Sequence, residues 1–203
     1  MGREGFFSFG SKFASPKVQA PAEGLKIDEN DVSDHSKLIK GQYDGINFPV
    51  VFKQKYGEKF NDILDTGWVN LFLISDRMKK ILEENKLTGW RTFPIRLYNP
   101  EGVEVPGYHG FSVIGRSSPT NYERSEIIEK QKIPNGPVSL YYKGVSVDTW
   151  DGADFFTPDQ TYQIFITKKA ADVLKKNKIT NFQLESLAEK ETAVHHVKKN
   201  MND

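Results

Sequence analysis

The chain has 203 residues and a mass of 23.1 kDa, which suffices for one sizeable hydrophobic core but not for several domains. Its 28 Lys and Arg residues nearly balance 27 Asp and Glu residues, so the basic excess typical of nucleic-acid-binding proteins is absent and no nucleic-acid partner is predicted. The sequence contains no cysteine, which excludes disulfides, thiolate metal sites and cysteine nucleophiles.

Residues 1–40 are rich in Ser, Pro, Ala and charged residues, which predicts a partly flexible N-terminal arm. Four phenylalanines indicate that part of this arm lies on the body of the protein or on a partner: Phe6, Phe7, Phe9 and Phe13. The first residues lack the apolar core of a secretory signal, and no stretch approaches the roughly 18 apolar residues of a membrane span. We therefore expect a cytoplasmic protein with no membrane contact.

The first strongly patterned segment covers residues 68–74, a nearly continuous apolar run rich in aromatic and β-branched residues. Such a run predicts a strand buried on both faces. Ser75 is a favourable helix N-cap, and Met78, Ile81 and Leu82 recur at helical spacing after it. The pattern predicts a strand that leads directly into an amphipathic helix.

The window over residues 72–90 recurs 92 positions further along the chain, over residues 164–182. Most positions keep their apolar class, the hydroxyl N-cap or a residue that tolerates left-handed backbone. Five positions are identical in both windows: Ile74, Leu82, Asn85, Lys86 and Thr88. The exposed charges differ, so packing and capping recur rather than chemistry. We predict a duplicated strand–helix–strand unit.

Strand-like segments lie among these helical patterns, so the chain is predicted to be an α+β protein with one mixed sheet. The additional strands are expected over residues 90–98, 107–115 and 138–147. A single domain is predicted over residues 41–187. The charged residues 188–203 are predicted to form a C-terminal helix or tail.

The search for catalytic motifs finds no phosphate-binding loop and no Rossmann glycine pattern, and Ile114 occupies the second glycine position of a nucleophile elbow. Asp148, Asp151 and Asp154 recur every third residue, and His109 lies between two glycines. These four residues could serve a small hydrolase, including one that cleaves carbohydrate. An Asp–Gly turn with local hydrogen bonds explains the same aspartates without chemistry. No metal site, cofactor or catalytic residue is assigned.

Several segments together resemble a group of uncharacterised bacterial proteins common in Bacteroidetes, which is similar to the domain-of-unknown-function 1629 family. The segments cover residues 87–95, 107–116, 150–156 and 178–181. The most distinctive element is the Ser-capped helix with its exit sequence K-L-T-G-W at residues 86–90. Members of that family are proposed to be immunity proteins of polymorphic toxin systems. The resemblance implies a toxin partner and carries over no catalytic residue.

An immunity protein needs a stable scaffold and a surface complementary to one toxin, with no chemistry of its own. We therefore predict a non-enzymatic protein that neutralises a cognate toxin. Tyr, Trp and Arg dominate interface hot spots. The predicted partner contacts are Tyr108, His109, Arg116, Trp150 and Asp151. The alternatives are the hydrolase and an adaptor module whose aromatic arm docks another protein. The oligomeric state is left open.

Overall fold

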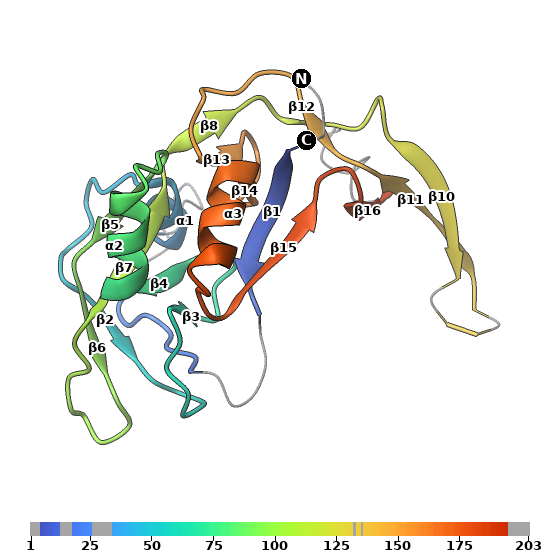
Figure 1. Ribbon diagram of the computed structural model, residues 1–203. Coiled ribbons are helices and arrows are strands. Elements are labelled where there is room, and N and C mark those ends of the chain that lie inside the picture. Colours follow the sequence, from blue (N-terminus) through green and yellow to red (C-terminus); the bar gives the residue numbers. More distant parts are fainter. Residues whose placement is uncertain (1–4, 13–17, 26–33, 132, 135, 195–203) are drawn as a thin grey trace.

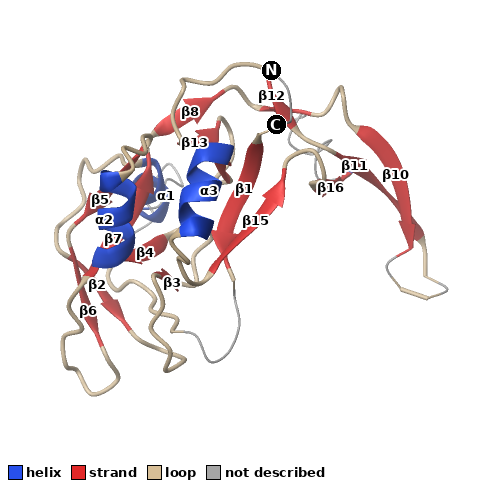
Figure 2. Ribbon diagram, viewed as in Figure 1, coloured by secondary structure: helices blue, strands red, loops and turns tan. Residues whose placement is uncertain are grey.

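The structure is a computed structural model that describes residues 5–12, 18–25, 34–131, 133–134 and 136–194. Within those residues the chain forms three helices and five sheets, and most strand pairs are antiparallel (Figures 1 and 2). The predicted α+β fold is confirmed. The prediction of one mixed sheet is wrong, because the short strands separate into sheets of five, four, three, two and two strands.

The largest sheet contains five strands, and its second strand comes from the N-terminal end of the chain (Figure 1). Its order is β15 (Phe182–Ser186), β1 (Phe6–Ser11), β14 (Ile164–Thr167), β13 (Phe155–Pro158) and β8 (Gly115–Ser117). Only the pair of β13 with β8 is parallel. The sheet therefore depends on pairing between the two ends of the chain.

The second sheet contains four antiparallel strands. Its order is β3 (Ile63–Asp65), β4 (Phe72–Ser75), β7 (Tyr108–Val113) and β5 (Trp90–Phe93). Helix α2 (Asp76–Glu84) follows β4, and helix α3 (Lys168–Lys176) follows β14 of the five-stranded sheet. The two helices lie side by side on the same side of the molecule (Figure 1).

Three small sheets complete the described structure. They are β10 (Glu126–Gln131) with β11 (Val138–Lys143) and β16 (Glu191–Ala193), β9 (Thr120–Asn121) with β12 (Ser146–Val147), and β2 (Val50–Lys53) with β6 (Ile95–Tyr98). The strand predicted over residues 90–98 is divided between two sheets, because Pro94 has no N–H group and interrupts the ladder. Its first half pairs with β7 and its second half with β2.

The helices α2 and α3 begin and end with the same types of residue. The Ser75 hydroxyl accepts a hydrogen bond from the Met78 N–H group, and the Thr167 hydroxyl accepts one from the Ala170 N–H group. Both helices are nine residues long and end at an asparagine. The predicted N-cap at Ser75 is confirmed.

We expect the substitution Thr167→Ala to lower the free energy of unfolding by about 1–2 kcal/mol, because the first turn of α3 loses its side-chain acceptor. Urea denaturation measures this change. The control is Thr149→Ala, since Thr149 is exposed and caps no helix, and we expect it to change stability by less than about 0.5 kcal/mol. Equal stability of the two variants would contradict the prediction.

Two aspartates connect the helix-bearing sheets to one another. Asp62, just before β3, accepts hydrogen bonds from the Ser75 hydroxyl at 2.9 Å and from the N–H and hydroxyl groups of Thr180, both at 2.9 Å. Its other close partner is the Arg77 guanidinium, at 2.6 Å. Asp62 therefore ties the start of α2 to the segment that follows α3.

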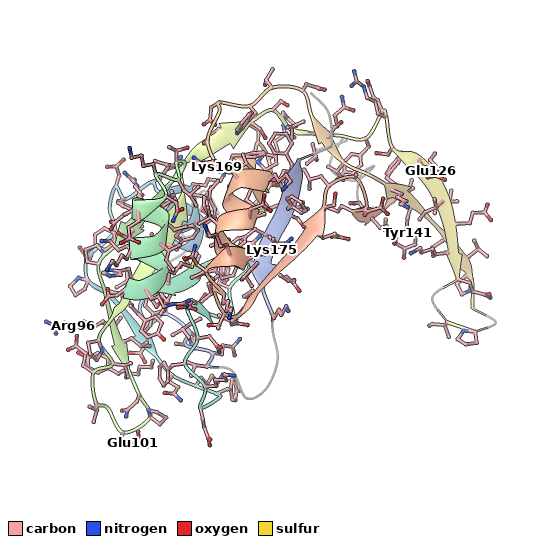
Figure 3. The ribbon with its side chains drawn as sticks, viewed as in Figure 1. Arg96, Glu101, Glu126, Tyr141, Lys169 and Lys175 are labelled. Atoms are coloured by element: carbon pink, nitrogen blue, oxygen red, sulfur yellow. The ribbon has the colours of Figure 1, made fainter. Side chains whose placement is uncertain are left out.

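Asp154, just before β13, makes the reciprocal connection. It accepts hydrogen bonds from the Thr167 hydroxyl at 2.9 Å, the Thr88 N–H group at 3.0 Å and the Lys169 ammonium at 3.1 Å. The start of α3 is thereby tied to the segment that follows α2. Lys169 lies on α3 close to this junction (Figure 3). Both carboxylates are buried and bonded within the fold.

The hydrophobic core consists of three clusters of buried side chains. The largest lies beneath α2 and α3, where the Phe9 ring lies 6.0 Å from Phe72 and 5.8 Å from Phe155. Phe9 thus joins the two large sheets. The second cluster contains Leu38 of α1 (Asp34–Lys40) and covers the other face of the four-stranded sheet. The third surrounds Phe165 on the other face of the five-stranded sheet.

The segment predicted as an arm, residues 1–40, contributes both β1 and α1 to the body of the protein. Phe6 and Phe9 are buried there, whereas Phe13 lies outside the described residues. In the predicted C-terminal helix or tail, residues 191–193 form strand β16, and residues 195–203 lie outside the described residues. The single domain over residues 41–187 stays a prediction. None of the described helices is long and apolar enough to span a membrane.

Candidate functional site

A groove of about 460 Å3 lies along the five-stranded sheet. The side chains of Phe7 and Phe9 pack into the cluster beneath α3. Side chains alternate along a strand, so Ser8 and Gly10 open onto the opposite face. Polar groups dominate that lining: Ser8, Asn70, Gln163, Gln183, Glu185 and Lys190. The groove therefore offers donors and acceptors for hydrogen bonding to a partner.

One acceptor in the groove lacks a partner within the described structure. The Oε1 atom of Gln163 is buried and accepts no hydrogen bond from any described residue. Burying an acceptor without a donor costs about 1–3 kcal/mol.

An exposed apolar rim borders the groove. Val69 is 70% exposed, Tyr162 is 43% exposed and Trp68 is 40% exposed. The Asn70 amide donates a hydrogen bond to the Tyr162 carbonyl at 2.7 Å, which holds the two segments together. We call Trp68, Val69 and Tyr162 the aromatic rim. Exposed aromatic residues beside a groove are the usual anchors of protein interfaces.

The inner end of the aromatic rim is supported by α1. The His35 ring stacks on Trp68 with 4.1 Å between centroids, and the Lys40 ammonium lies 5.2 Å from the Tyr162 ring centroid. Burial lowers the pKa of His35, and the charge of Asp34 opposes that shift. The lowered pKa favours the neutral form of the imidazole that stacks on the Trp68 indole, and α1 supports one side of the rim.

The first two sequence-selected residues, Tyr108 and His109, lie at the start of β7. The Tyr108 hydroxyl donates to the Asn61 carbonyl at 2.9 Å, and burial together with the Asp62 charge raises the pKa of Tyr108 to about 12. His109 Nε2 lies 2.6 Å from an Asp76 carboxylate oxygen in the first turn of α2. Tyr108 serves the fold, and His109 stays partly exposed.

The other three lie beyond the opposite end of β7. The Arg116 guanidinium donates to the carbonyls of Val113, Gly115 and Lys40, and its burial lowers the pKa of Arg116. The Asp151 carboxylate accepts from the Arg116 backbone N–H group at 2.7 Å. The Trp150 ring packs 5.2 Å from Phe6. The structure brings these three together and separates them from His109.

The comparison with protein families gives a match that covers residues 6–189 and therefore extends from β1 to the segment before β16. The matching family is described as the immunity protein family Imm11. The chain belongs to this Imm11 family. A search of curated proteins found no match. The predicted function, an immunity protein of a bacterial toxin system, is confirmed, and membership implies that this Imm11 protein binds a cognate toxin.

The four residues considered for a hydrolase do not share one site in the Imm11 protein. Asp148 binds the Asn121 amide, Asp151 accepts from the Ala153 N–H group at 2.9 Å, and Asp154 belongs to the junction between the sheets. The partner of His109 is Asp76. In the described part of the chain, no group of three or more His, Asp or Glu side chains could hold a metal ion. The aspartates act as turn and junction residues.

The groove and the aromatic rim of the Imm11 protein were not predicted from the sequence. The apolar run over residues 68–74 predicted a buried strand, but β4 begins only at Phe72. Asn70 adopts the left-handed conformation with φ at 59°, and the Leu71 N–H group donates to the Trp68 carbonyl. This turn exposes Val69. The signal that could have found the rim is Asn70 itself, because asparagine tolerates the left-handed conformation that turns the chain here.

Proposed function

We propose that this Imm11 protein neutralises its cognate toxin in the cytoplasm by forming a stoichiometric complex, and that it catalyses no reaction. The observation that carries the proposal is the groove with its aromatic rim, which combines exposed apolar anchors with a polar floor. A protein partner can bury such anchors and pair such polar groups at the same time. The polar residues of the alternative hydrolase are engaged within the fold instead.

The five residues selected from the sequence stay proposed toxin contacts, secondary to the groove and the aromatic rim. The side chains of His109 and Asp151 are accessible at the surface. Those of Tyr108 and Arg116 donate hydrogen bonds to backbone carbonyls, and the Trp150 ring packs against Phe6. Truncating the last three would disturb the fold as well as any interface. The groove and the aromatic rim are therefore the better surface for tests of toxin binding.

We also propose that the two helix-bearing units are copies of one strand–helix–strand unit. The strand registers support this proposal. Ile63 pairs with Ile74, and the residues 92 positions after them, Phe155 and Ile166, also pair with each other. The junction aspartates follow the same shift, since Asp62 and Asp154 occupy equivalent positions. Asn70 and Tyr162 are also 92 positions apart, and a hydrogen bond joins them beside the groove.

The test of neutralisation combines growth protection with analysis of the complex. We expect co-expression of this protein to restore growth of bacteria that produce its cognate toxin domain. The purified pair should elute as a complex of fixed stoichiometry, and the toxin should keep its mass, because no bond is made or broken. Growth protection accompanied by a change in toxin mass and no complex would overturn the proposal.

A further inference from the structure

The β10–β11 hairpin projects away from the helices and the two large sheets (Figures 1 and 3). Within the described residues, its partner strand is β16, which pairs with the base of β11 through residues 141–143. Residues directly opposite each other in antiparallel strands share a face. The register therefore assigns Ile127, Glu129 and Gln131 to the same face as Val138, Leu140 and Tyr142. We call this the outer face of the hairpin.

The outer face carries large apolar side chains that the rest of the described structure leaves open. Ile127 is 59% exposed, Val138 is 57% exposed and Leu140 is 45% exposed. Tyr142 lies at the base, with its ring 5.2 Å from that of Tyr122. The opposite face of the same sheet buries Tyr141. Apolar side chains gathered on one face of a projecting hairpin mark an interaction surface.

The charges of this small sheet are distributed unequally between its two faces. Lys130 pairs with Glu191 at 2.6 Å, and Lys143 pairs with Glu189 at 2.8 Å. The register places both lysines on the face opposite the outer face. Glu129 lies on the outer face, directly opposite Leu140, and no ion pair joins it to a described residue. The outer face therefore combines three exposed apolar side chains with one carboxylate, that of Glu129.

We propose that the outer face of the hairpin docks on an apolar, basic surface of the cognate toxin. This inference rests on the proposed function and adds a second contact to the groove. Lys190 lines the groove and immediately precedes β16, so the hairpin sheet starts at the groove's edge. A partner held in the groove can reach the hairpin. Pairing of two copies through this face brings two Glu129 carboxylates together, which disfavours self-association.

The test replaces the outer-face anchors by threonine, which keeps the β-branched shape and strand preference while removing apolar surface. We expect the triple variant Ile127→Thr, Val138→Thr and Leu140→Thr to bind the toxin domain at least about tenfold more weakly by calorimetry. The matched control is Val103→Thr, because Val103 is 61% exposed outside the hairpin. It should bind within about twofold of the wild type.

A second arm of the test examines the Glu129 charge. We expect Glu129→Lys to weaken binding at least about tenfold, and raising the salt from about 0.1 M to about 0.5 M should weaken the wild-type complex more than that of Glu129→Gln. If the wild type binds and the hairpin variants bind within about twofold of it, the docking proposal is wrong. Absence of any wild-type complex instead contradicts the proposed function. Loss of a self-associated form with unchanged toxin affinity also overturns the docking proposal.

Discussion

Replacement of Asp62 by alanine is expected to lower the free energy of unfolding by about 2–3 kcal/mol, because the buried carboxylate accepts several charge-assisted hydrogen bonds. The carboxylate accepts hydrogen bonds from Ser75 and from both donors of Thr180, and it pairs with Arg77. Removing it takes the acceptor away from Ser75, Thr180 and Arg77 and separates the start of α2 from the exit of α3. Urea denaturation near neutral pH measures the loss.

The same carboxylate makes stability depend on pH in a defined direction. Burial alone would raise the pKa of Asp62, but hydrogen bonds from the Thr180 backbone, Ser75, the Thr180 side chain and Arg77 outweigh it and lower the pKa below 3.8. A lowered folded-state pKa contributes stability above the unfolded-state value, and that contribution is lost as the pH falls through the folded-state pKa. Asp62→Asn should therefore lose less stability than the wild type between about pH 6 and pH 3.

The control for Asp62 is Asp148→Asn. Asp148 is exposed, and its side chain accepts a hydrogen bond from the amide of Asn121. We expect its stability within about 0.5 kcal/mol of the wild type. If Asp62→Ala is as stable as Asp148→Asn, the aspartate does not join the two sheets energetically. An unchanged pH dependence in Asp62→Asn would contradict the assigned direction of the pKa shift.

Local patterns predicted the parts of the fold that neighbouring residues determine. The Ser75 cap and the apolar spacing of Met78, Ile81 and Leu82 are properties of one segment, and α2 forms where they predict it. The position of β1 could not be predicted in this way. Its partners β14 and β15 lie at the other end of the chain, and pairing over that separation leaves no local signature.

The candidate site was harder to predict, because residue type does not reveal exposure. Arg116 and Trp150 are typical hot-spot residues, but their polar groups donate to carbonyls of the fold. Trp68 and Val69 belong to an apolar run that predicts burial, yet the left-handed residue Asn70 turns the chain and exposes them. One backbone conformation therefore decides whether this run is core or surface. The immunity function was predictable from the sequence, because the resemblance that implies it rests on short local motifs.

The aromatic rim is expected to supply most of the apolar binding energy to the toxin. The double variant Val69→Asp and Tyr162→Ala should weaken binding by at least about 2 kcal/mol, or roughly 30-fold. The aspartate places a charge where a partner would bury a methyl group, and the alanine removes an aromatic anchor. Calorimetry with the toxin domain measures the affinity, and growth protection measures its consequence.

The matched control is the double variant Val103→Asp and Tyr56→Ala. Val103 is 61% exposed and Tyr56 is 58% exposed, and neither residue lines the groove. Both double variants change exposed side chains, so both should unfold within a few degrees of the wild type. If the two double variants bind the toxin equally well, the rim is not part of the interface. If only the rim variant loses binding and protection, the groove that the rim borders is where the toxin is held.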